Sequence, residues 1–271
     1  PREGGAFYMI TRILGLLRVI SSSFTMQAKE RATNQFFVGT LLVLPIIFTL
    51  LSVGTYLYGG KGDFGLFAVI GAGMMGVWNA NLWTSGRIVE GERRGGTLST
   101  LIASPTPFPV ILVGKSLSNA FASLISLVVT FATGLIAFRL KLDITYPAAF
   151  VISMILTLIS MTCFGLVLGS VFVLSRNAGD FMEAANYPIF ILSGLMFPLT
   201  VLPAWLRPLS SLLAPTWGNL ALSSSAGLIG ENPWLIDLYL IGLSLAYLII
   251  ARVLFKQVEY RVRRDGSMEV F

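Results

Sequence analysis

The 271-residue sequence contains no histidine, a single cysteine and few charged residues. Without histidine, the chain lacks the commonest metal ligand and the commonest general base. The lone cysteine, Cys163, has no second cysteine in the chain to pair with, and its place within an apolar run is typical of a small packing residue. These absences disfavour histidine-based catalysis and a disulfide-stabilised fold.

Charge is scarce as well, since Asp, Glu, Lys and Arg make up 12% of the residues and hydrophobic residues make up 55%. A soluble domain carries about a quarter of charged residues. Apolar runs of about 20 residues, enough to cross roughly 30 Å of hydrocarbon, recur along the chain. We therefore expect an all-α polytopic membrane protein with six transmembrane helices, at 37–58, 64–83, 112–138, 147–174, 187–202 and 234–255.

Residues 1–36 precede this six-span domain (37–255), and a basic tail (256–271) follows it. Apolar residues recur at helical spacing in the N-terminal segment, among several basic residues: they are Ile10, Ile13, Leu14, Leu17 and Phe24. The segment is too charged to span a bilayer and predicts an amphipathic helix at the membrane interface. A soluble cytosolic helix is the alternative.

Prolines interrupt the apolar stretch between the fifth and sixth spans, at positions 198, 203, 208 and 215. Proline removes a backbone donor and breaks a continuous helix. We expect a re-entrant segment of short helices at about 203–230, because irregular backbone at membrane depth needs protein or water around it.

The basic residues predict the orientation of the spans. With six spans, fifteen of the 19 lysines and arginines fall on the side that holds both termini, and only Lys61, Arg139, Lys141 and Arg207 fall on the other. Positive residues favour the cytoplasmic side. We expect a multi-pass protein of the cell membrane with both termini in the cytoplasm, and we attribute the net charge of +6 to topology rather than to nucleic-acid binding.

Two short motifs imitate nucleotide-binding loops. Residues 71–76 read GAGMMG, which fits G-x-G-x-x-G, but the apolar run continues through them where a strand–turn–helix unit would be needed. Gly114-Lys115-Ser116 would end a phosphate-binding loop, but Pro109 occupies the position of its first glycine. We expect both motifs to lie in membrane helices, where small residues allow close packing.

The stretch between the second and third spans is the most charged and glycine-rich in the chain. It reads GRIVEGERRGGTLSTLIASP from Gly86 to Pro105. It predicts a short helix on the membrane surface at about 87–105 that docks on a cytoplasmic partner, with mixed charges for register and leucines as anchors. The alternative is a solvated loop.

This stretch resembles the membrane subunits of type-2 ABC exporters. The resemblance rests on Glu-x-Glu, Gly-Thr-Leu, Leu and Ser-Pro, followed by Gly114-Lys115, and on the segment YPIFILSGLMFPLTVLPAWLRPLSSLLAPTW at 187–217. The second segment is most similar to the antibiotic-resistance and multidrug branch of that family. The doubled glycine at 95–96 departs from the more usual single glycine.

The resemblance implies that a separate ATPase subunit, present in two copies, binds ATP and Mg²⁺, while this chain binds no cofactor or metal and has no catalytic residues. It implies a coupling helix that contacts the ATPase through Glu90, Glu92, Arg93, Arg94, Gly96, Thr97, Leu98, Leu101, Ser104 and Pro105. A second contact is expected at Asp180 and Glu183. Two permease subunits, most simply a homodimer surrounded by lipid, would enclose the route.

Candidate residues for the translocation pathway are the large or polar side chains of the second and fifth spans: Trp78, Asn79, Asn81, Phe190, Met196 and Phe197. Ordinary helix packing is the alternative for each. If they line a route, they suit a drug, an antibiotic or a lipid-like molecule with a large apolar surface. A polysaccharide or lipid-linked glycan exporter is the second functional hypothesis.

Two other classes are disfavoured. A proton- or sodium-coupled transporter would normally carry an ionisable residue in the middle of a span, and none occurs there; Lys115 and Arg252 lie near span ends, where they can extend to the interface. A membrane-embedded lipid-modifying enzyme would need clustered histidines or carboxylates, which the sequence does not provide.

Overall fold

The computed structural model of the protein describes residues 3–59, 65–81, 91, 95–96, 108–140, 143–173 and 178–265. Every regular element within these residues is a helix. In chain order the elements are α1 (Glu3–Thr33), α2 (Gln35–Tyr58), α3 (Gly65–Asn81), α6 (Phe108–Phe138), α7 (Pro147–Val173), α8 (Ala178–Leu192), the 3-10 turn η3 (Leu199–Val201), α9 (Arg207–Ser210), α10 (Ala214–Ser225) and α11 (Pro233–Asp265). The all-helical prediction is confirmed for the described part of the chain.

Within the part of the chain that the structure describes, four helices are long and apolar enough to cross a membrane. The crossing segments are Phe37–Tyr58 in α2, Val110–Phe138 in α6, Pro147–Val171 in α7 and Pro233–Gln257 in α11. The other two expected spans fall on α3 and α8, which have 17 and 15 residues. At 1.5 Å per residue the described parts of these helices are roughly 25 and 22 Å long, shorter than the roughly 30 Å hydrocarbon core. A total of six spans therefore stays a prediction.

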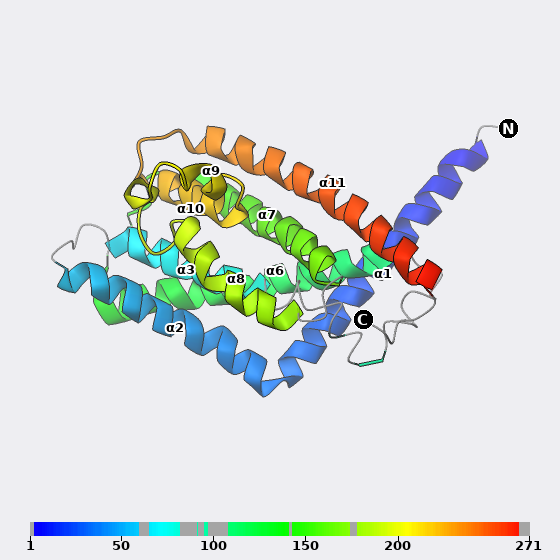
Figure 1. The fold of residues 1–271 in the computed structure, drawn as a ribbon, viewed down its shortest axis with the longest axis horizontal. Coiled ribbons are helices and arrows are strands. Elements are labelled where there is room, and N and C mark those ends of the chain that lie inside the picture. Colours follow the sequence, from blue (N-terminus) through cyan, green and yellow to red (C-terminus); the bar gives the residue numbers. More distant parts are fainter. Residues whose placement is uncertain are drawn as a thin grey trace.

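The long helices run side by side, and the short helices α9 and α10 lie at one end of the bundle (Figure 1). At that end α2 finishes and α11 starts. At the opposite end α6 starts and α11 finishes, and the N-terminal part of α1 extends beyond the bundle. The structure thus has two distinct ends, and their assignment to the two sides of a membrane stays a prediction.

α1 and α2 meet in a corner at Asn34. The Asn34 side chain accepts a hydrogen bond from the backbone N–H of Phe37 at 3.2 Å, and its own backbone N–H donates to the carbonyl of Arg31 at 3.0 Å. Asn34 therefore ends one helix and caps the next. On α1 the exposed apolar side chains include Ile13, Leu14 and Leu17. The N-terminal helix is confirmed, and its place at the membrane interface stays a prediction.

α3 is the central helix of the bundle. All of its residues except Leu66 and Asn79 are buried, and it packs against α2, α6 and α10. A Cβ added to Gly71 would overlap with the backbone oxygen of Leu195, and one added to Gly134 of α6 would lie 2.8 Å from Val69 Cγ2. Small residues thus allow close backbone approach here, as expected for packed membrane helices.

The fifth predicted span, 187–202, is not one continuous helix. α8 begins earlier, at Ala178, and ends at Leu192, where Gly194 takes a φ of +66°. The N–H of Leu195 donates to the carbonyl of Phe190 at 3.4 Å, and that of Gly194 donates to Ile191 at 3.2 Å, which is the Schellman arrangement. Residues 178–186 were expected in a loop but are helical. The charged residues Asp180 and Glu183 end the apolar span, but they do not prevent a helix from forming.

After this turn the chain forms the short elements η3, α9 and α10, as the prolines predict. Both α9 and α10 have a proline in their first two positions, where its missing N–H costs no helical hydrogen bond. In α10 only Trp217 and Leu220 are not buried, and the Asn219 side chain donates to the carbonyl of Gly194 at 2.9 Å. The expected broken helices are confirmed, while their depth in a membrane stays a prediction.

Candidate functional site

Most of the predicted coupling helix lies outside the described residues. This holds for Glu90, Glu92, Arg93, Arg94, Thr97, Leu98, Leu101, Ser104 and Pro105. Within that stretch, the N–H of Gly95 donates to the carbonyl of Gly91 at 2.8 Å, and exposed Gly96 has a φ of +68°. A positive φ favours glycine, so the second glycine of the pair has a local structural role in a turn.

The helix that follows this stretch, α6, is packed against α1. A Cβ added to Gly114 would lie 2.6 Å from the carbonyl oxygen of Ile20. Further along, the rings of Phe24 and Phe121 meet edge to face with their centroids 6.1 Å apart. The N-terminal helix and the helix after the predicted coupling segment are therefore joined over about two turns.

Both imitations of nucleotide loops are helical. Residues 71–76 lie inside α3 and Gly114–Ser116 lies inside α6, so neither backbone forms a loop. The expectation that both motifs are helical is confirmed, and α6 contains one of the segments able to cross a membrane, whereas a crossing by α3 stays a prediction. Lys115 was expected to extend to the interface, but it is only 4% exposed and lies beside the α1 contact at Gly114. α1 packs closely on α6 at the adjacent Gly114, and the sequence pattern of one span could not reveal this burial.

Asp180 and Glu183, the predicted second ATPase contact, lie in the first turns of α8. Their side chains are outside the described residues. The spacing of three places them on one face of the helix. Their role stays a prediction.

Three predicted pathway residues, Trp78, Asn81 and Phe190, are buried within the chain. Trp78 is 1% exposed, and its indole N–H donates to the side-chain oxygen of Asn186 on α8 at 2.8 Å. Its ring lies 5.8 Å from that of Phe164 on α7. In this conformation Trp78 ties α3 to α7 and α8.

The other three predicted pathway residues are more accessible. Met196 is 50% exposed, and its backbone oxygen accepts a hydrogen bond from the Tyr56 hydroxyl at 3.1 Å. Asn79 and Phe197 are partly exposed. The surface formed by the turn after α8 is therefore open to a second molecule, whereas the Trp78 region is not.

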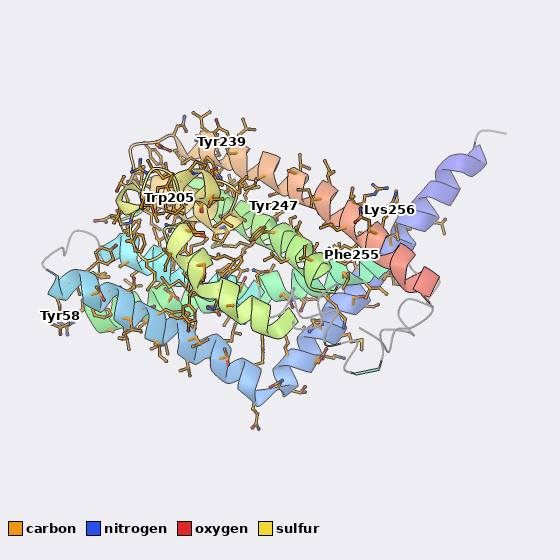
Figure 2. All side chains as sticks on the ribbon, viewed as in Figure 1. Tyr58, Trp205, Tyr239, Tyr247, Phe255 and Lys256 are labelled. Carbon is orange, nitrogen blue, oxygen red and sulfur yellow. The ribbon has the colours of Figure 1, made fainter. Side chains whose placement is uncertain are left out.

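Exposed aromatic side chains mark one end of the bundle. Tyr58, which is 95% exposed, and Trp205, which is 73% exposed, lie at that end, whereas Phe255 and Lys256 lie near the opposite end (Figure 2). Tyrosine and tryptophan favour the membrane interface, and lysine favours the cytoplasmic side. Because tyrosine and tryptophan are enriched at both interfaces, these side chains agree with an interface at each end, and which end faces the cytoplasm stays a prediction.

Arg31 is a buried cation at the corner between α1 and α2. Its guanidinium carbon lies 4.6 Å from the centroid of the Phe37 ring. Among the described residues, its Nη1 has no hydrogen-bond partner. Desolvation lowers the pKa of Arg31 from its ordinary value to about 10, and the neighbouring Glu30 carboxylate partly offsets this shift.

Sequence reasoning overlooked Asp237, a buried carboxylate in the first turns of α11. It is 4% exposed, and the Ser153 hydroxyl of α7 donates to its Oδ1 at 2.8 Å. Asp237 lies near the end of a predicted span, and the search for ionisable residues covered only span centres. Its partner is 84 positions away along the chain, so no local signal connects the two residues.

Comparison with known proteins identifies the family. A model of the family described as ABC-2 type transporter matches residues 8–226. Two curated relatives, each named "Probable multidrug ABC transporter permease YbhR", from Escherichia coli strain K12 and from Escherichia coli O157:H7, are 28% identical over 131 residues. The match covers 48% of this chain and 34% of each relative, so it spans about a third of the relatives' length. Because the family model covers most of the sequence, the chain belongs to the ABC-2 type transporter family.

Proposed function

We propose that this chain is the membrane subunit of an ABC exporter that moves an amphipathic or hydrophobic substrate, such as a drug, an antibiotic or a lipid-like molecule, out of the cytoplasm. ATP hydrolysis on a separate ATPase subunit drives the transport. The observation that carries the proposal is the family match over residues 8–226. The similarity to relatives named as multidrug permeases supports the substrate class.

The proposed orientation has both termini in the cytoplasm of a cell bearing the protein in its inner or plasma membrane. In this orientation the end of the bundle with the start of α6 and the end of α11 faces the ATPase, and the end with α9 and α10 faces outward (Figure 1). Lys256 then lies at the cytoplasmic end, as the bias of lysine predicts, and Trp205 lies at the outer end, where an interfacial tryptophan is equally acceptable.

The proposed coupling runs from the 87–105 segment into α6. α6 begins at Phe108, soon after that segment, and extends for 31 residues. It packs against α1, α2 and α3. A movement of α6 would therefore require these three helices to move with it or to change their packing against it. Closure of an ATPase on the 87–105 segment would thereby shift the equilibrium between two packings of the bundle.

The proposed route lies between two copies of the permease rather than through one. Trp78, Asn81 and Phe190 are buried inside the chain, which supports a role for them in holding α3 in place. Met196 is half-exposed beside partly exposed Phe197, so these side chains are better placed to contact a substrate or the second copy. An apolar surface of this kind favours a ligand with large apolar area.

Two substitutions in the 87–105 segment test the coupling. Glu92→Ala and Leu101→Asp are expected to abolish co-purification with the cognate ABC ATPase, or to keep it and lose ATP-driven export, because one removes a charge that sets register and the other places a charge at an apolar anchor. Glu231→Ala is the matched control, because Glu231 is an exposed carboxylate in the loop before α11 at the opposite end. It should leave both properties unchanged.

The measurements are pull-down of the ATPase and ATP-dependent transport of a fluorescent amphipathic dye by vesicles that contain both subunits. Membrane insertion of all variants is checked by fractionation. Wild-type co-purification and dye transport in both coupling variants would contradict the coupling assignment. Failure of the wild-type complex to move any amphipathic dye, with intact ATP hydrolysis, would contradict the substrate class and leave the coupling assignment standing.

A further inference from the structure

Small and polar side chains line the seam between α7 and α11. On α7, Ser153, Thr157 and Ser160 recur at intervals of four and three residues, so they share one face of the helix. All three are buried, at 0%, 2% and 0% exposure. Asp237 and Ser244 of α11 are buried along the same helix pair, which is in extensive contact.

The seam is closed on its third side by α10. A Cβ added to Gly218 of α10 would lie 2.5 Å from Thr157 Cγ2 and 3.1 Å from Thr157 Oγ1. Ala221 of α10 packs in one cluster with Ile236 and Leu240, the neighbours of Asp237 on α11. Three helices thus enclose the polar side chains.

Three oxygen atoms in this seam lack a hydrogen-bond partner among the described residues: Asp237 Oδ2, Thr157 Oγ1 and Ser160 Oγ. Buried polar atoms are nearly always satisfied by protein, water or an ion. Of the three, Asp237 has the greatest need of a partner, because an ionised carboxylate that is buried without a countercharge is strongly destabilising. Among the described residues, its one side-chain hydrogen bond comes from the hydroxyl of Ser153, which is neutral.

No side chain of the surrounding helices supplies the countercharge. α7 and α10 contain no charged residue. The only cysteine, Cys163 on α7, lies ten positions beyond Ser153. On α11, the basic residues begin at Arg252, about four turns from Asp237. A mobile positive charge is therefore needed if the carboxylate is ionised.

We propose that Asp237, together with the hydroxyl oxygens of Ser153 and Thr157, binds a small monovalent cation of sodium size at the junction of α7, α10 and α11. Carboxylate and hydroxyl oxygens are hard ligands suited to such ions. The cation neutralises Asp237 and occupies the lone pairs left free in the seam. It acts as a stabilising ligand of the bundle, whatever substrate the exporter moves.

The ligand set favours a monovalent ion over a divalent one. No group of three or more His, Cys, Asp or Glu side chains that could hold a metal ion occurs among the described residues. Protein sites for calcium use six to eight oxygen ligands, several of them usually carboxylates. One carboxylate with neutral hydroxyls balances a single positive charge.

The test is thermal unfolding of the full chain in nanodiscs, followed by tryptophan fluorescence, in NaCl, KCl or choline chloride at constant ionic strength. We expect a saturable rise of the apparent Tm in sodium over choline, of roughly 5–10 °C at a sodium concentration a hundredfold above the dissociation constant. Asp237→Asn keeps the shape of the side chain and should abolish the rise. Asp143→Asn, at an exposed carboxylate in the loop before α7, is the matched control and should keep it.

A wild-type protein with the same apparent Tm in sodium and choline, at pH values from 5 to 9, would overturn the proposal and indicate a protonated carboxyl group or water instead. Retention of the full sodium effect in Asp237→Asn would overturn it as well. Because Asp237→Asn can fail to fold, Thr157→Val provides a second variant, in which a ligand oxygen is lost at similar volume. It is expected to raise the sodium concentration for half-maximal stabilisation at least tenfold, and an unchanged value would remove Thr157 from the site.

Discussion

Substitution of Gly71 by alanine tests how closely α3 packs against the turn after α8. An alanine Cβ at this position would overlap with the backbone oxygen of Leu195. That oxygen cannot rotate away as a side chain could, so the two segments must separate. Gly73→Ala is the matched control on the same helix, because its Cβ would lie 3.5 Å from Thr130 Cγ2 and 3.6 Å from Leu127 Cγ, which are ordinary contacts.

The size of the effect follows from two opposing contributions. Overpacking a core costs about 1–3 kcal/mol, and the upper end applies where the obstacle is backbone. Alanine in a helix interior gains about 1 kcal/mol over glycine. We therefore expect Gly71→Ala to lower the free energy of unfolding by about 2 kcal/mol and Gly73→Ala to raise it by about 1 kcal/mol.

The difference of about 3 kcal/mol corresponds to roughly 6–12 °C in apparent Tm for a chain of this size. The assay is thermal unfolding of the purified full chain in detergent or nanodiscs, followed by the fluorescence of its five tryptophans. Equal Tm values for Gly71→Ala and Gly73→Ala would refute the reasoning, because they would mean that α3 does not meet the Leu195 backbone. A membrane-insertion check excludes variants that never reach the bilayer.

Two further substitutions address single buried groups. Trp78→Phe should lower the free energy of unfolding by about 1–3 kcal/mol, because it removes the 2.8 Å hydrogen bond to Asn186. Trp205→Phe, at an exposed site, is the control and should change the free energy of unfolding by less than about 0.5 kcal/mol. Equal effects of the two substitutions in chemical denaturation would contradict a stabilising role of the Trp78–Asn186 hydrogen bond. The lowered pKa of Arg31 means that the buried charge destabilises the fold at neutral pH, and this penalty is relieved only as the pH rises above about 10 toward the ordinary pKa of arginine. Arg31→Met should therefore raise the free energy of unfolding at pH 7 by about 1–3 kcal/mol. The reason is that the desolvation cost of roughly 3 kcal/mol exceeds the cation–π contribution of Phe37, which is about 0.5–2 kcal/mol. A lower Tm in this variant would show that the guanidinium has a partner that stabilises it.

Some of the candidate site was accessible from sequence and some was not. The helical state of 71–76 and 114–116 could be predicted, because an uninterrupted apolar run favours a helix over a nucleotide loop. The break after α8 could be located within a few residues from Gly194 and Pro198. The start of α8 at Ala178 could not be located, because the hydrophobic pattern marks the limits of an apolar span and a helix can extend beyond them.

The sequence by itself determined the class of the protein, the positions of its long apolar helices, the broken segment before α11 and the family resemblance, because composition and periodicity are local properties. Only the tertiary structure decided which residues meet. It showed that Trp78 is packed inside the chain, that Lys115 is buried next to the Gly114 contact with α1 and that Ser153 reaches Asp237 across 84 positions. Such pairings depend on how the helices pack in the bundle. A polar residue near the end of an apolar run, such as Asp237, can be given a role only once the helix that packs against it is known.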